Sequence, residues 1–289
     1  MQRGRKEQVM EKTAAEQTRA FRMSLDLDAT PDQVWRALTE AEELVRWFPT
    51  GARVTPGKGG RMLWSWGYGE DWVTTIDEWE PGKLLRLVQE EARPYDAQGH
   101  PLPPGEVEAA RIAMEFTLET VQGKTRLRLV HSGFGHGAAW DAEVDGISEG
   151  WQAELRSLRH YLRRHRGRNR RAARGLVNTA VPRDAAWARL TGPGGYLLSP
   201  VSPKEGEAFE VVTPGGRRYS GTVELNLTGV TLAGTVRELD DGWFRLLTWR
   251  DARGHTGVWA WLAAYTDDDR AVREFGEEAQ TALERLFKE

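Results

Sequence analysis

The chain has 289 residues and no cysteine, with 40 Lys and Arg against 43 Asp and Glu and a formal net charge of -3. The length favours two domains, and the missing cysteines exclude disulfides, thiolate metal ligands and a cysteine nucleophile. This charge gives no overall field that would attract nucleic acid. The first residues lack the apolar run of a secretory signal, and no stretch approaches the roughly 18 apolar residues of a membrane span, so we expect a cytoplasmic protein.

The first half of the chain predicts a strand, two short helices, a run of antiparallel strands and a long final helix. The alternating segment SLDLD precedes TPDQVWRALTEAEELVRWF, which has a proline at a helix start. Strand patterns follow in RMLWSW, DWVTTIDEWEPG, KLLRLVQEE, RIAMEFTLET and KTRLRLVHSGF. In the closing helix, Trp151, Leu155, Leu158 and Leu162 are spaced by four and three residues, which predicts one apolar face.

Strand parity predicts which side chains face the interior. The inward set is Met62, Trp64, Trp66, Leu85, Leu87, Ile112, Met114, Phe116, Leu118, Leu127 and Leu129. Arg126 and Arg128 then face solvent, and His131 continues the inward parity. A long helix laid across a curved sheet would bury this inner face and leave room between the two.

Residues 156–174, RSLRHYLRRHRGRNRRAAR, form a basic stretch. It could be a phosphate-binding strap, and residues 163–174 are the one candidate for nucleic-acid contact. The stretch has no interleaved aromatic residue beyond Tyr161. We therefore interpret it as a helix C-terminus, where the macrodipole favours cations, which continues into a solvated linker.

The basic stretch separates two segments of similar pattern. Each has a short strand, a proline at a helix start and the motif Trp-x-x-Leu-Thr, at residues 35–39 and 187–191. The second segment also closes with an amphipathic helix, on Phe275, Ala279, Leu283 and Leu286. We predict an α+β protein with two tandem helix-grip domains, residues 22–165 and 174–289, each a curved antiparallel sheet wrapped around a long C-terminal helix.

Three segments of the first half together resemble a known family. They are TPDQVWRALTEAEELVRWF, TIDEWEPGKLLRL and the pair LRLVHSGFG and GWQAELRSLRHYL. The first domain, from about residue 23 to 165, is similar to the family of Hsp90 ATPase activator homologues in the START-like (SRPBCC, Bet v 1-like) superfamily. The resemblance implies a pocket between sheet and helix, with HSGFGHG as a strand end and loop. The second segment has the same order of predicted strands and helices but lacks the Gly-Phe and Gly-Trp motifs, so we interpret it as a diverged START-like copy.

Histidines and acids around residue 131 raise the question of a metal or catalytic site. A metal site would need His131 and His136 to converge with Asp141 or Glu143, and the spacing matches no standard ligand pattern. We expect no metal and no cofactor. An acid-base site would use His131, oriented by Glu115 or Asp141. A histidine at a strand edge more often completes a hydrogen-bond network, so His131 and Glu115 are weak catalytic candidates.

Tryptophan is concentrated in the first segment, and large amphipathic rings suit the walls of a cavity for an apolar ligand. The predicted ligand-binding residues are Trp64, Trp66, Phe116, His131 and Trp151. We expect Trp35 to pack rather than to contact a ligand. We also expect the larger pocket in the first domain, because GPGGYLLSPVSP replaces the second helix, with its Trp47 and Phe48, in the second.

Three functions stay open at this point. The first is non-catalytic binding of a small hydrophobic or aromatic ligand, which needs only a dry pocket with one or two polar anchors. The second is an Hsp90-type co-chaperone or ATPase activator, as the resemblance implies. The third is a cyclase-like or hydrolase-like enzyme that uses His131. The lack of a complete catalytic constellation favours the binder.

Overall fold

The strands of the protein form two separate seven-stranded antiparallel sheets. The computed structural model describes residues 19–267 and 269–288. The strand order is β1-β7-β6-β5-β4-β3-β2 in the first sheet and β8-β14-β13-β12-β11-β10-β9 in the second. The two orders correspond strand for strand, with the first strand of each half at the edge beside the last. The predicted tandem arrangement of antiparallel, helix-gripping domains is therefore confirmed.

The first domain has the predicted order of strand, helix pair, strands and closing helix. Its elements are β1 (Ala20–Leu27), α1 (Pro31–Thr39), α2 (Ala41–Leu44), β2 (Gly51–Thr55), β3 (Arg61–Ser65), β4 (Trp72–Glu80), β5 (Leu84–Ala92), β6 (Ala110–Val121), β7 (Lys124–Ser132), α3 (Ala138–His160) and the π-helical turn η2 (Tyr161–His165). Thr30 and Gln33 form a capping box at the start of α1, which explains why the helix begins at the predicted proline.

The second domain repeats this order with one helix fewer. Its elements are β8 (Arg171–Thr179), α4 (Arg183–Leu190), β9 (Leu197–Ser199), β10 (Ala208–Val212), β11 (Arg218–Leu227), β12 (Thr231–Val236), the 3-10 turn η3 (Arg237–Leu239), β13 (Gly242–Arg250), β14 (Thr256–Ala264) and α5 (Arg270–Leu286). A turn at residues 191–196 follows α4 directly, as the glycines and proline there predicted.

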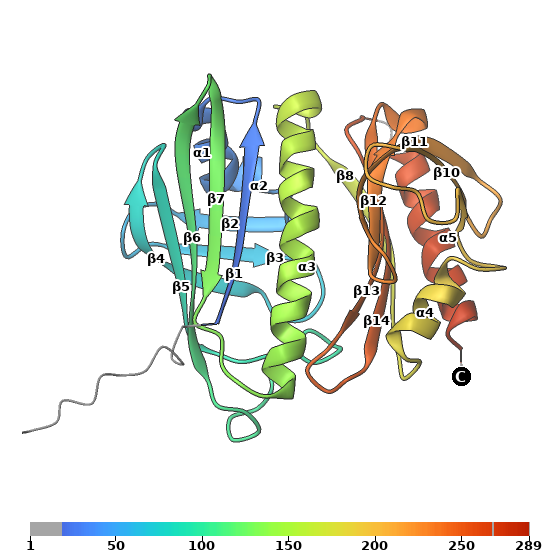
Figure 1. The fold of residues 1–289 in the computed structure, drawn as a ribbon, viewed down its shortest axis with the longest axis horizontal. Coiled ribbons are helices and arrows are strands. Elements are labelled where there is room, and N and C mark those ends of the chain that lie inside the picture. The colour runs from blue at the N-terminus through green and yellow to red at the C-terminus, as the bar shows by residue number, and fades with distance from the viewer. Residues whose placement is uncertain (1–18, 268, 289) are drawn as a thin grey trace, which may run out of the picture.

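The protein is built in four layers: first sheet, α3, second sheet and α5 (Figure 1). Helix α3 packs on its own sheet through Leu155 and Leu158, which belong to the core of the first domain. Its opposite face lies against the second sheet, where Ala153 packs with Trp243 and Trp261. The helix that was predicted to cover one sheet therefore covers two, and the domains share it as a common layer.

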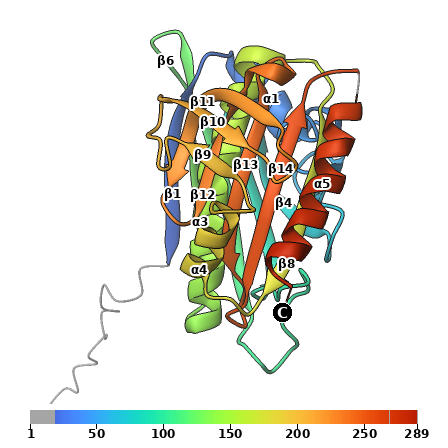
Figure 2. The same cartoon turned by 90° about the vertical axis from the view of Figure 1, so that its right-hand side faces the viewer.

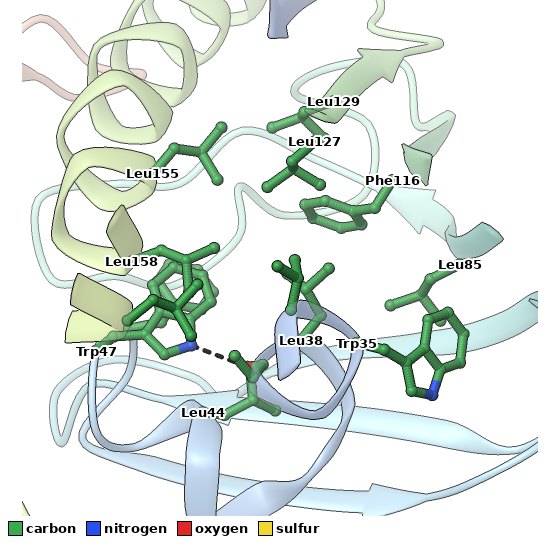
Figure 3. Packing of buried hydrophobic residues seen from close by; sticks show 14 of the residues in the cluster. Trp35, Leu38, Leu44, Trp47, Leu85, Phe116, Leu127, Leu129, Leu155 and Leu158 are labelled. Carbon is green, nitrogen blue, oxygen red and sulfur yellow. Dashed lines mark hydrogen bonds between the residues drawn. The ribbon is translucent and has the colours of Figure 1, made fainter. Parts of the chain in front are cut away.

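The core of the first domain follows the predicted parity. Figure 3 shows Phe116, Leu127 and Leu129 from the sheet facing Leu155 and Leu158 of α3. The inward residues of β3, β5, β6 and β7 are buried as predicted, with Trp66, just beyond β3, half-buried. Trp35 packs edge-on against Trp79, with ring centroids 5.0 Å apart, which fits its expected packing role.

Helix α5 packs directly on β8 in the second domain (Figure 2). A Cβ atom at Gly175 would lie 2.5 Å from the carbonyl carbon of Ala279, so only glycine permits this approach. Tyr196, Phe244 and Phe275 fill the space on the same side of the sheet. The missing side chain at Gly175 thus allows α5 to lie close to β8, and the three aromatic rings fill the core beside the helix.

The basic stretch begins within α3 and includes the cationic helix C-terminus that was predicted. The expectation that it continues as a solvated linker needs correction, because several of its arginines connect the two domains. Its contacts are Arg156 with Glu205, Arg159 with Glu224, Arg164 with Asp241, Arg168 with Asp240, Arg170 with the carbonyl oxygens of Phe48 and Pro49, and Arg174 with that of Trp66. The acids belong to the second domain, so the cations at the C-terminal end of α3 are neutralised there. Arg163, Arg166 and Arg171 remain exposed.

Candidate functional site

A cavity of about 270 Å³ lies between the two domains, beside the N-terminal half of α3. Its wall comes from the loop after β3, the loop after β5, one face of α3, and strands β13 and β14. The volume lies just below the range of roughly 300–1,000 Å³ that is typical of small-molecule sites. The expected assignment of the pocket to the first domain needs correction, because the outer face of the second sheet forms one of its sides.

Aromatic rings from both domains line the cavity. They are Phe48, Trp66, Tyr68, Trp72, Tyr95, Trp151, Trp249 and Trp259. Tyr68 and Trp259 meet edge to face across the domain boundary, with centroids 6.1 Å apart. Arg174 lies over both rings, 5.0 Å from the centroid of Tyr68 and 5.8 Å from that of Trp259. It also donates to the carbonyl oxygen of Trp66 at 2.7 Å, so one guanidinium fixes three aromatic residues of the wall.

Acidic side chains of α3 face the same cavity and two of them are paired. Glu149 accepts hydrogen bonds from Arg183, with one N–O distance of 3.0 Å. Glu154 accepts from the buried Arg245 of β13 at 2.8 Å. Both pairs bridge the domains across the cavity wall. Removing one partner of such an ion pair leaves an uncompensated buried charge, which costs much more free energy than the intact pair contributes to stability. These two pairs therefore favour one relative position of the domains.

Glu143 is the third acid of α3 in the wall, and its surroundings differ. Its carboxylate accepts one hydrogen bond, from the backbone N–H of Tyr95 at 3.2 Å. Among the residues that the structure describes, no Lys, Arg or His lies within ion-pair distance of it. Burial raises the pKa of Glu143 to about 7, and the hydrogen bond from Tyr95 opposes part of that rise. Glu143 is half-buried and lines the cavity.

The structure divides the five predicted ligand-binding residues into two groups. Trp66 and Trp151 line the cavity. Trp64, Phe116 and His131 are buried behind that wall, with His131 fully inaccessible. Trp151 donates its indole N–H to His131 Nδ1 at 3.2 Å, and no polar partner is described for His131 Nε2. Burial lowers the pKa of His131 to about 3, so it is a neutral residue that positions Trp151.

The expected pairing of His131 with an acid is not found. Glu115 faces away from His131 on β6 and lies 3.8 Å from Arg86 on the outer surface of the sheet. Strand parity explains this, because the neighbouring Met114 and Phe116 face inward. Asp141 forms an exposed ion pair with Arg19 at 2.5 Å. The described part of the chain contains no group of three or more side chains placed to bind a metal.

Sequence reasoning missed the wall that the second domain contributes, although two signals point to it. Strands β13 and β14 carry apolar residues at successive positions, in GWFRLLTWR and TGVWAWLAA, which is typical of strands buried on both faces. Helix α3 also has a second face of small residues, namely Ala142, Gly146, Gly150, Ala153 and Ser157. At Ala153 this face packs on the second sheet, and at Ala142, Gly146 and Gly150 it lines the cavity.

Residues 28–163 match the family model described as Activator of Hsp90 ATPase homolog 1-like protein. The first domain, which is slightly less than half of the chain, is therefore similar to this family. The predicted resemblance is confirmed, and the match lies within the range of residues that carried it. No curated protein matches the chain. Among the described residues, no helix is both long and apolar enough to cross a membrane.

Solved structures with a similar fold include single-domain and two-domain proteins. Protein MLL2253 from Mesorhizobium loti is 24% identical, covers 50% of this chain with 97% of its own, and has a TM-score of 0.41. BexL, a di-domain ARO/CYC protein from the BE-7585A biosynthetic pathway, is 15% identical over 93% of this chain and 96% of its own, with a TM-score of 0.42. DynU16, a putative protein of the dynemicin biosynthetic locus, is 18% identical over 93% and 95%, with a TM-score of 0.40.

Proposed function

We propose that the protein binds a small, mostly aromatic molecule in the cavity between its domains, without transforming it. The observation that carries the proposal is the wall itself, in which Trp66 and Tyr68 of the first domain oppose Trp249 and Trp259 of the second. Flat rings on opposite walls suit a flat guest, through stacked and edge-to-face contacts. The polar groups beside them, chiefly carboxylates, can orient the guest.

The described wall of the cavity contains no Ser, Cys, Lys or His that the unpaired Glu143 could activate, and this supports binding over catalysis. His131, the histidine first considered for catalysis, is separated from the cavity by Trp151. Glu149 and Glu154 are held by Arg183 and Arg245. A catalytic acid or base must reach the reacting atoms, and these groups are already bonded to protein partners.

Two measurements test the proposal. Native mass spectrometry of the protein purified from its own cells should detect a retained small molecule. Calorimetric titration with a neutral aromatic probe, 1-naphthylmethanol, should give saturable binding in the micromolar range. Trp66→Ala and Trp259→Ala, one from each domain, should each weaken binding about tenfold, because each removes a ring from the wall.

A matched control is Trp79→Ala. Trp79 packs on Trp35 away from the cavity, so its loss should leave the dissociation constant unchanged. If Trp66→Ala and Trp259→Ala bind the probe as the wild type does, the cavity is not the binding site. If the protein converts a retained molecule into a product, the proposal of non-catalytic binding is wrong and the protein is an enzyme.

The second candidate function is an effect on an Hsp90-type chaperone, and the family match favours it. It requires a protein-binding surface rather than a cavity. The test is whether the full chain stimulates the ATPase rate of a purified Hsp90. Stimulation that persists in Trp259→Ala would favour the co-chaperone and separate it from ligand binding.

A further inference from the structure

We propose that the interdomain cavity selects aromatic ligands that carry a protonated amine, and that Glu143 is the residue that recognises the amine. This inference rests on the proposed function and names the ligand class for the same site. Three independent features of the cavity support it: the position of Glu143, the charges of the wall and the arrangement of the aromatic rings.

Glu143 is a cavity carboxylate without a charged partner among the described residues, and unlike the exposed Glu70 it is half-buried. One backbone N–H, that of Tyr95, occupies one of its oxygen atoms, and a carboxylate can accept several further hydrogen bonds. The two other acids of the α3 face, Glu149 and Glu154, already have guanidinium partners. An ammonium group on a ligand would supply Glu143 with the charge-assisted hydrogen bond that the described protein side chains do not supply.

The charges of the wall favour a cation. The lining contains six carboxylates, of Glu70, Asp96, Glu143, Glu149, Glu154 and Asp251, and two guanidiniums, of Arg245 and Arg250. Glu149 with Arg183 and Glu154 with Arg245 neutralise each other, and Arg174 adds a cation beside Tyr68 and Trp259. The carboxylates of the lining without a guanidinium partner are those of Glu70, Asp96, Glu143 and Asp251, and they outnumber Arg174 and Arg250. Low-dielectric aromatic walls strengthen the remaining negative field, which attracts a cation and disfavours an anion.

The aromatic rings complete the recognition. Trp72 and Tyr95 line the cavity together with Glu143, and the N–H of Tyr95 itself bonds to the carboxylate. The faces of Trp and Tyr rings attract cations, so an ammonium beside Glu143 would have π faces as further neighbours. A ring on the same ligand would then lie among Trp66, Trp249 and Trp259.

The test compares three probes of one shape by calorimetry at pH 8: 1-naphthylmethylamine, which is protonated, 1-naphthylmethanol, which is neutral, and 1-naphthoate, which is anionic. The full-length wild type should bind the amine about tenfold more tightly than the alcohol and should bind the anion most weakly. Glu143→Gln keeps the shape of the side chain and should abolish the preference for the amine, with binding of the alcohol retained. Asp145→Asn, on the exposed side of α3 and outside the wall, should retain the preference.

The outcomes separate this inference from the proposed function. Equal binding of amine and alcohol, or tightest binding of the anion, would overturn the cation selectivity and leave an aromatic-binding cavity. A preference for the amine that survives Glu143→Gln would overturn the role of Glu143. Failure of all three probes to bind would count against both the inference and the proposed function.

Discussion

Arg170 donates a hydrogen bond from Nη2 to the carbonyl oxygen of Pro49 at 2.7 Å, which joins the segment before β8 to the loop after α2. The same nitrogen reaches the carbonyl oxygen of Phe48 at 3.2 Å, and the guanidinium lies 5.6 Å from the ring centroid of Trp261. One side chain therefore connects the first domain, the connecting segment and the outer face of the second sheet.

Arg170→Gln should destabilise the folded protein by about 2–4 kcal/mol, because it leaves two carbonyl groups without their charged donor. Arg171 is the adjacent arginine and is exposed, so Arg171→Gln should change the free energy of unfolding by less than about 0.5 kcal/mol. Urea unfolding of both variants measures the difference. Equal stability of the two would mean that the basic stretch is a solvated linker after all.

Two glycines inside helices should respond to alanine in opposite ways. In α5, a Cβ at Gly276 would lie 2.8 Å from the Cβ of Ala173, so Gly276→Ala should destabilise by about 1–3 kcal/mol through overpacking. In α3, a Cβ at Gly150 would meet no atom within 4 Å because the residue faces the cavity. Gly150→Ala should stabilise by up to about 1 kcal/mol through helix propensity. The melting temperatures of both variants test this prediction. Destabilisation by Gly150→Ala would show that the added methyl group has no open space at this position.

Local patterns were sufficient to predict each domain taken singly. Alternation in RIAMEFTLET and KTRLRLVHS placed Met114, Phe116, Leu127, Leu129 and His131 on the buried face, where the structure has them. The Trp-x-x-Leu-Thr repeat placed corresponding helices in both halves, at α1 and α4. These features depend on residues close in the chain, for which the periods of strand and helix are strong constraints.

The interdomain site could not be predicted in the same way, because it depends on how two units dock. Glu143 and Trp259 are far apart in the chain and become part of one wall only when the second sheet packs on α3. The arginines of residues 156–174 appeared to have no partners within their own segment, and the acids that they bind lie in the second domain. Apolar residues on both faces of β13 and β14, and the small residues along one face of α3, were the signs in the sequence that another layer covers the second sheet.

Glu143 should make the protein less stable as pH rises. Its pKa is raised from 4.5 to about 7 in the folded state, so the folded protein holds this proton more tightly than the unfolded chain. The contribution of Glu143 to stability therefore falls between about pH 4.5 and pH 7 and is constant above that. Glu143→Gln should be more stable than the wild type at pH 8, by on the order of 1–3 kcal/mol, with the difference shrinking toward pH 4.5. Urea unfolding at the two pH values measures it, and a difference independent of pH would contradict the raised pKa.

His131 should have the opposite effect and make the protein less stable in acid. Burial lowers its pKa from 6.5 to about 3, so the unfolded chain takes up a proton in a range where the folded protein does not. Its stabilising contribution is complete above about pH 6.5 and is lost as the pH falls toward 3, at up to about 1.4 kcal/mol per pH unit. His131→Phe removes this titration and the acceptor of the Trp151 indole, so it should be less stable at pH 7 and lose less stability on acidification. Free energies of unfolding of both proteins at intervals from pH 4 to pH 7 provide the comparison, and parallel curves would show that the pKa of His131 is not lowered in the folded protein.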